Sequence, residues 1–298
     1  MIKNIVAFLS FTLPILGHGQ LIQPEKPKRL VLDELLVQTA VFGEFSQEAG
    51  LTDFHKLVPN SGLLQKNLNE FQQSNSRAFY ASSALSAQTG WKLFNPKTQS
   101  YRSNMSLRLG FNLLRGYSLS SNWYQNESFT FDSLTSSQND LIIYRDSVYN
   151  RNFSANYRST QFRLDAAMVW KSSSEKRLQI WGGLGINTGI SLNSIVDVNF
   201  IDSGRIVTYD NNNEVFYQQG DYFVGGSLRE RSSTRNSFGF SAYVPLGISF
   251  RIGNKSELLR RFHLVFEARP GLNATVIRGI NSTWNPSFQY GIGLKISL

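Results

Sequence analysis

The chain has 298 residues, a formal net charge of +9, 13% aromatic residues, 17% charged residues and no cysteine. Soluble domains usually carry roughly 25% charged residues, and a disordered chain would have fewer aromatic residues. No run of about 18 apolar residues occurs, which excludes membrane-spanning helices. The absence of cysteine excludes disulfides, thiolate metal sites and a lipid-modified N-terminal cysteine.

Residues 1–19 have the features of a secretory signal peptide. Lys3 supplies the positive start, residues 5–16 form an apolar stretch, and Gly-His-Gly at 17–19 provides small residues before a cleavage site at Gln20. The apolar stretch falls short of the roughly 20 residues that a membrane-spanning helix needs. We therefore expect export followed by cleavage.

Residues 20–80 differ from the rest of the chain in their residue pattern, which predicts a short, partly helical periplasmic extension. A basic, proline-containing linker covers residues 23–29. Residues 30–45 are rich in apolar side chains, and residues 61–71 carry them at helical spacing, with Ser61 in the N-cap position. We expect this extension to pack against or into the mouth of the domain that follows. In the alternative interpretation, residues 31–45 form one half of an additional strand pair.

A period of two runs through residues 81–298 and predicts β-strands. From Phe288 to Leu298 every even position is a large apolar or aromatic residue, and every odd position is polar or glycine. Such alternation puts one face of a strand against an apolar phase. The same period predicts eight strands, over residues 82–94, 101–113, 117–131, 157–170, 177–193, 237–251, 262–276 and 286–298.

The connections between these strands alternate in length. Residues 114–116, 171–176 and 253–261 are short connections on one side, whereas the polar segments 132–156 and 194–236 are long loops on the other. This asymmetry with an even number of strands is typical of an outer-membrane β-barrel. The predicted fold is therefore all-β, an eight-stranded antiparallel up-and-down transmembrane barrel over residues 81–298, or ten-stranded if residues 31–45 join it. A soluble β-sandwich would instead have polar outward rows.

The signal peptide, the eight strands and the C-terminal segment Tyr290–Leu298 together resemble the small outer-membrane β-barrel proteins of the Bacteroidota. The plan is also similar to the eight-stranded barrels of other Gram-negative bacteria. The resemblance covers residues 80–298 as a pattern, and it implies a place in the outer membrane. That location in turn implies contact with outer-membrane lipids, including lipopolysaccharide.

Eight strands enclose an interior just wide enough for side chains. The inward rows place seven charged residues there: Lys92, Arg108, Arg163, Asp165, Glu267, Arg269 and Lys295. Five positive charges and two negative charges give +3. Charges in a narrow interior must be paired, because their desolvation is costly. We expect Asp165 and Glu267 each to be bracketed by Arg or Lys in a network that fills the barrel; the alternative is an anion-lined pore.

Basic residues also gather at the predicted periplasmic rim: Arg115, Lys171, Lys176, Arg177, Arg251, Lys255, Arg260 and Arg261. A basic rim suits anionic lipid headgroups or an envelope protein partner. Aromatic and basic residues are not interleaved into a stacking platform, so no nucleic-acid partner is predicted.

Only two histidines, His55 and His263, follow the signal peptide. Their spacing does not suit a metal site, and no catalytic, cofactor-binding or metal site is predicted. The predicted function is a non-enzymatic outer-membrane barrel that acts as a structural or interaction subunit of the cell envelope, as in a secretion or assembly machine. A small solute channel is one alternative. A lipid-modifying enzyme is another, with His263 as its one candidate base.

Overall fold

The computed structural model describes residues 30–66, 68–74, 77–95, 100–135, 142–172, 177–210, 215–217, 223–253, 256–282 and 284–298. Its strands are β1 (Leu30–Phe45), β2 (Gln47–Glu48), β3 (Gln72–Ser74), β4 (Phe79–Asn95), β5 (Ser100–Thr135), β6 (Ile142–Lys171), β7 (Leu178–Asp210), β8 (Val215–Tyr217), β9 (Phe223–Ser233), β10 (Ser237–Tyr243), β11 (Leu246–Arg251), β12 (Phe262–Ile277) and β13 (Trp284–Ser297). Two short helices, α2 (Leu51–Leu57) and α3 (Glu257–Arg261), complete the described elements. No helix in these ranges is long and apolar enough to cross a membrane.

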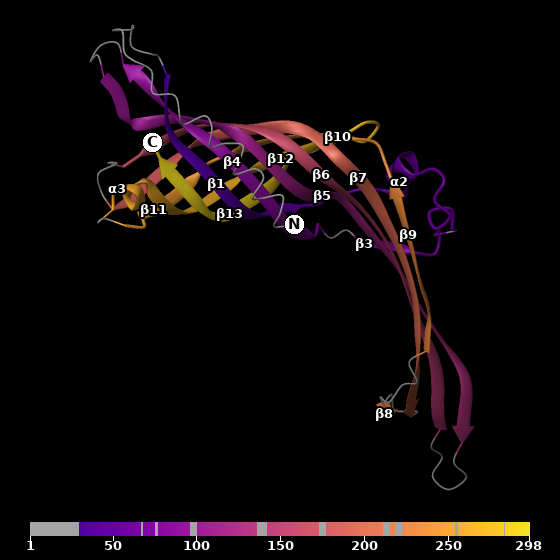
Figure 1. Cartoon of the computed structure of the whole chain (residues 1–298). Helices are drawn as coiled ribbons and strands as arrows, with labels where there is room; N and C mark the ends of the chain where they lie inside the picture. Colours follow the sequence, from indigo (N-terminus) through magenta and orange to yellow (C-terminus); the bar gives the residue numbers. More distant parts are fainter. Residues whose placement is uncertain are drawn as a thin grey trace.

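The strand pairings form a closed ring. Starting from β1, successive neighbours are β4, β5, β6, β7, β10 with β11, β12 and β13, and β13 pairs again with β1. These ring pairs are all antiparallel. β10 and β11 each pair with both β7 and β12, so they share one place in the ring (Figure 1). The interruption between them falls at Val244 and Pro245, because proline has no N–H for the ladder.

The ring is apolar outside and polar inside. Its outward residues include Leu109, Leu164, Ile180, Leu184, Ile186, Ile190, Leu192, Ile248, Phe266, Leu272, Ile292 and Leu294, each at least 40% exposed. Its buried residues include Gln88, Arg108, Asn112, Arg163, Asp165, Gln179, Asn187, Glu267, Arg269, Asn273, Gln289 and Lys295. A protein in water buries apolar side chains and exposes charged ones. The reversed polarity suits an apolar phase around the ring.

Four strands continue together past one end of the ring and form a structure that we call the blade. It comprises residues 118–135 of β5, 142–158 of β6, 194–210 of β7 and the whole of β9, in the order β5–β6–β7–β9. Figure 1 shows these strands leaving the ring on the side of α2. We call this the blade end; the opposite end, where β1 begins and β13 ends, is the α3 end.

The described residues between 46 and 74, which include β2, α2 and β3, form a cap at the blade end. Phe54, Leu57 and Leu64 of the cap are buried against Trp123 and Phe153 of the blade. Val196 and Val198 of β7 and Ile277 at the end of β12 belong to the same cluster. The cap therefore has an ordinary apolar core, which covers the base of the blade at the mouth of the ring.

The predicted strands 82–94, 262–276 and 286–298 are confirmed as β4, β12 and β13, and the predicted strands 157–170 and 177–193 lie within the longer strands β6 and β7. The separate strands 101–113 and 117–131 are not confirmed. β5 runs from Ser100 to Thr135, so the turn predicted at 114–116 is wrong. In the structure Gly116 lies inside β5, where its missing side chain leaves room for the Glu44 carboxylate.

The assignment of residues 20–80 to a separate extension is wrong for Leu30–Phe45, which is ring strand β1 and pairs with both β4 and β13. The cap lies at the end opposite to the C-terminus, so it is not on the side predicted as periplasmic. The predicted loops 132–156 and 194–236 are largely strand, because β5, β6, β7 and β9 extend through them. The predicted signal peptide at 1–19 lies outside the described residues.

Candidate functional site

A carboxylate at the centre of the ring, that of Glu267 on β12, collects four donors. Arg108 on β5 donates from Nη1 at 2.7 Å, and Arg269 donates from Nε at 2.7 Å. Trp181 Nε1 and Gln38 Nε2 donate at 2.9 Å and 3.3 Å. β5 and β12 stand opposite each other in the ring. The Arg108–Glu267 pair therefore spans the interior.

Asp165 on β6 extends the network toward the blade end. Its carboxylate accepts from Arg269 Nη1 at 2.9 Å, from Gln88 Nε2 at 2.9 Å and from Asn112 Nδ2 at 2.5 Å. The Tyr243 hydroxyl is a further partner. Side chains from β4, β5, β6, β10 and β12 thus meet at one carboxylate, and they fill the space between those strands.

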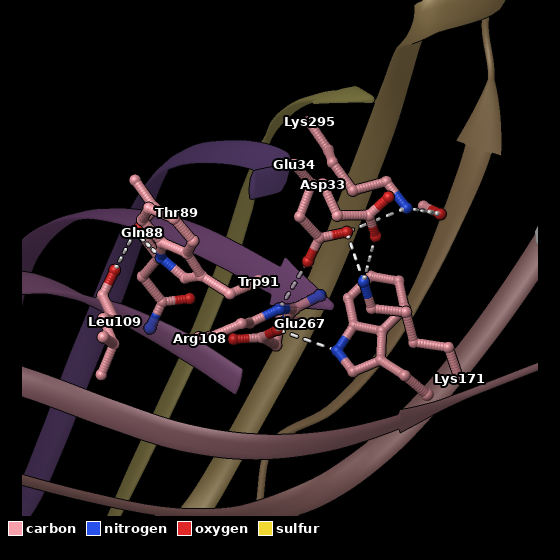
Figure 2. Close-up of polar contacts among 12 residues, drawn as sticks. Asp33, Glu34, Gln88, Thr89, Trp91, Arg108, Leu109, Lys171, Glu267 and Lys295 are labelled. Carbon is pink, nitrogen blue, oxygen red and sulfur yellow. Dashed lines mark hydrogen bonds and ion pairs between the residues drawn. The ribbon is translucent and has the colours of Figure 1, made fainter. Parts of the chain in front are cut away.

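Glu34 on β1 extends the network toward the α3 end (Figure 2). Its carboxylate accepts from Arg108 Nε at 2.9 Å and from Lys171 Nζ at 2.7 Å, and Lys295 Nζ lies 3.9 Å away. Asp33 pairs with Lys171 at 3.4 Å and with Lys92 at 2.6 Å. Charges of opposite sign therefore alternate from the centre of the ring to its edge.

Arg163 belongs to a second, mostly neutral cluster. Its guanidinium donates to side-chain oxygens at 2.5 to 3.0 Å on Gln161, Asn187, Ser241 and Asn273. Asn273 in turn contacts the buried carboxylate of Glu44. An amide thus connects the two opposite charges, and the arginine is surrounded by acceptors from several strands.

The interior is closer to neutral than the sequence indicated. Among the described residues its buried charges are Arg108, Arg163, Lys171, Arg269 and Lys295 against Glu34, Glu44, Asp165 and Glu267, so five minus four leaves +1. The predicted value was +3. Glu34 and Glu44 were missed because β1 was not assigned to the ring, and Lys92 stands at the edge with 35% of its side chain exposed. The signal in the sequence that could have placed Glu34 and Glu44 inside the ring is their alternation with apolar residues along β1.

Only some of the residues predicted for the basic rim lie exposed at the α3 end. Arg260 and Arg261 are exposed on α3, whereas Lys171 is buried with Glu34. Arg115 pairs with Thr160 near the blade end, so its place among the rim residues is wrong. Lys176 lies outside the described residues.

A second charged cluster lies on the outward face of the blade, where sequence analysis placed a loop. Asp197 on β7 accepts from Arg231 Nε at 2.7 Å and from Arg229 Nη2 at 3.3 Å, and Arg158 Nε lies 3.0 Å from its other oxygen. Burial by itself would raise the pKa of Asp197. The Arg231 hydrogen bond and the neighbouring guanidinium charges outweigh burial, and the pKa lies below its ordinary value.

His263, the one candidate base, is buried on β12 beside Arg251 and Lys295 of the adjacent strands. Two cationic neighbours do not orient or activate an imidazole as a carboxylate does. The described residues also contain no group of three or more His, Cys, Asp or Glu side chains that could hold a metal ion.

No protein-family model matches the chain, and no curated protein sequence matches it. Among solved structures, the attachment invasion locus protein Ail of Yersinia pestis, in complex with the heparin analogue sucrose octasulfate, is 8% identical, with 89% of this chain and 100% of Ail covered and a TM-score of 0.22. The outer membrane channel DcaP of Acinetobacter baumannii is 10% identical, with 93% and 100% covered and a TM-score of 0.16. OmpT, an outer membrane protein of Vibrio cholerae, is 8% identical, with 92% and 99% covered and a TM-score of 0.14. Similarities with TM-scores this low do not establish a shared fold, so the function proposed below depends on the geometry of this chain.

Proposed function

We propose that the protein is an eight-stranded outer-membrane β-barrel that acts as a non-enzymatic interaction subunit of the cell envelope. The reversed polarity of the ring supports the membrane location, because a belt of exposed Leu, Ile and Phe is stable only in an apolar phase. Closure of the ring through β1 and β13 also removes the free strand edges that a bilayer cannot satisfy.

The orientation follows from the lengths of the connections. At the α3 end the ring strands are joined by residues 96–99, 172–177 and 252–261, whereas the blade and the cap lie at the other end. Barrels of this class have short periplasmic turns and longer extracellular segments. The blade and the cap then face the outside of the cell.

The blade is the observation that carries the proposed role. In the described pairings β9 is bonded along one edge only, to β7, and β5 beyond Tyr124 is bonded only to β6. The blade also exposes apolar side chains, among them Phe129, Ile201 and Leu228, each about half exposed. Unpaired strand edges beside exposed apolar side chains are a template for a protein partner.

The interior supports this role over a solute channel. Arg108 meets Glu267 across the ring, and Arg269 links Glu267 to Asp165, so side chains from opposite strands are in contact. Breaking such buried pairs costs about 3–5 kcal/mol. A passage along the axis would require several of them to separate.

The test is a mild-detergent pull-down of tagged protein from outer membranes, comparing the native chain with a shortened blade. Tyr124, Asn152, Ile201 and Ser227 lie in one row of the blade. Replacing residues 125–151 and 202–226 each by Asn-Gly would therefore end all four strands at the same level while keeping their register. We expect a stoichiometric partner with the native chain and its loss with the shortened one.

The shortened chain must still migrate on unheated gels as a folded barrel, which separates loss of contact from loss of fold. A partner retained in full by the shortened chain would place the contact elsewhere and contradict the role of the blade. Purification of the native chain alone, together with steady conductance in planar bilayers, would favour the channel instead.

A further inference from the structure

Three arginines surround one aspartate on the outward face of the blade. Arg158, Arg229 and Arg231 all contact Asp197, within 3.3 Å. Three positive charges and one negative charge leave a formal +2. Asp197 is only 8% exposed, whereas the side chains of Arg229 and Arg231 are 59% and 50% exposed. The side chain of Arg158 is only 12% exposed, so the carboxylate holds the three guanidiniums together while those of Arg229 and Arg231 face outward.

The neighbouring acid on the same strand does not neutralise this excess. Glu230 of β9 lies on the opposite face of the blade, where its carboxylate accepts from Ser61 Oγ at 3.0 Å and from the Leu63 backbone N–H at 3.1 Å. Alternation along a strand puts Glu230 and its two flanking arginines on different faces. Glu230 is therefore bound by the cap, whereas Arg229 and Arg231 lie on the outward face of the blade.

The cluster lies just above the apolar belt. On β6, Phe162, Thr160 and Arg158 alternate along the same outward row, and Phe162 is the last large apolar residue before the cluster. Four residues span about 13 Å along a strand. For strands tilted by about 35–45°, Arg158 then stands roughly 10 Å above Phe162 along the membrane normal. The headgroup layer extends roughly 5–8 Å beyond the hydrocarbon core on each side, so Arg158 stands at its outer edge.

We propose that Arg158, Arg229 and Arg231 form a binding site for the phosphate groups of an outer-leaflet glycolipid, the lipid A moiety of lipopolysaccharide. This inference depends on the orientation given under the proposed function. Planar guanidinium groups bind phosphate through paired hydrogen bonds, and several of them can share the two to four negative charges of a phosphorylated headgroup. Asp197 acts as the positioning residue that keeps the three groups together.

The test titrates the full-length protein in detergent with lipid A that carries both phosphates, with native mass spectrometry as the readout. We expect the native chain to bind it at least about tenfold more tightly than the same lipid without phosphates. The double variant R229Q/R231Q should lose about tenfold in affinity for the phosphorylated lipid. The matched control R260Q/R261Q removes the same charge at the α3 end and should stay within about twofold.

Folding of each variant is checked by migration on unheated gels. Should the double variant fail to fold, the single variants R229Q and R231Q each leave Asp197 paired with two arginines, and each should weaken binding by about threefold. Equal affinity for the phosphate-free lipid, or an equal loss in R260Q/R261Q, would overturn the proposal. Displacement of lipid A by an equal concentration of inorganic phosphate would overturn it in favour of free phosphate. If the blade has no protein partner, the lipid A titration is unchanged. The proposed interaction subunit and the proposed lipid A site can therefore fail independently of each other.

Discussion

Replacing Glu267 by leucine is the most severe single test of the charged interior. The substitution removes the acceptor of four hydrogen bonds, from Arg108, Arg269, Trp181 and Gln38. Both guanidiniums keep one carboxylate, because Arg108 still contacts Glu34 and Arg269 still contacts Asp165. The interior charge rises from +1 to +2, since one of the four buried acids is lost.

The magnitude follows from the donors left without an acceptor. Two charged donors and two neutral donors lose their partner in a site that is closed to solvent. Each charged hydrogen bond contributes about 1.5–3 kcal/mol and each neutral one about 1 kcal/mol. The carboxylates that Arg108 and Arg269 retain offset part of this loss, so E267L should destabilise the folded state by about 3–5 kcal/mol. Urea-dependent unfolding from lipid vesicles, followed by tryptophan fluorescence, measures this difference.

E257L is the matched control, because Glu257 on α3 is 88% exposed and its ion pair with Arg261 is long, at 3.7 Å. We expect the stability of E257L to stay close to that of the native chain. A loss below about 1 kcal/mol in E267L would refute the reasoning, since it would mean that the arginines find other partners at little cost. The double variant E267L/R108M should recover part of the loss, because it removes the Arg108 donor that E267L leaves without an acceptor, while Glu34 keeps its pair with Lys171.

Three further predictions concern the blade, the ring and the cap. The depressed pKa of Asp197 means that its contribution to blade stability is complete above its unfolded pKa of about 3.9 and is lost as the pH falls through the lower folded pKa. Amide protection factors in β9 should therefore drop as the pH falls below about 4, whereas those of D197N should show no such step. G239V should destabilise the barrel by about 1–3 kcal/mol in the same urea assay, because a Cβ at Gly239 meets the Gln161 and Arg163 side chains, and G62A, with open space around it, should be near neutral. F54A should release the cap, at a cost of about 3–5 kcal/mol, with faster proteolysis of the cap and unchanged gel migration; resistance equal to the native chain would contradict the packing assigned to Phe54.

The sequence by itself determined which residues face outward and which face inward on most of the ring. Strict alternation over residues 288–298, and a looser alternation over 178–192, requires two different environments on the two faces of a strand. Leu184 and Ile292 are accordingly exposed, and Asp165 and Glu267 are buried. This part was predictable because a side chain's face depends on its parity within a strand segment that has no bulge, and the register shifts at Gly116/Leu119 and Thr160/Gln161 lie near the blade end.

The partners of each strand were decided only by the tertiary structure. β1 pairs with β13, more than two hundred residues away, and that pairing brings Glu34 and Glu44 into the interior. Nothing local in residues 30–45 specifies this neighbour, because a ring closes wherever two free edges meet. The blade was missed for a related reason: beyond its base, where Phe153, Val196 and Val198 face the cap, its strands carry polar residues on both faces, and period-two alternation appears only where one face is apolar. The cluster of Arg158, Asp197, Arg229 and Arg231 exists only because three such strands lie side by side.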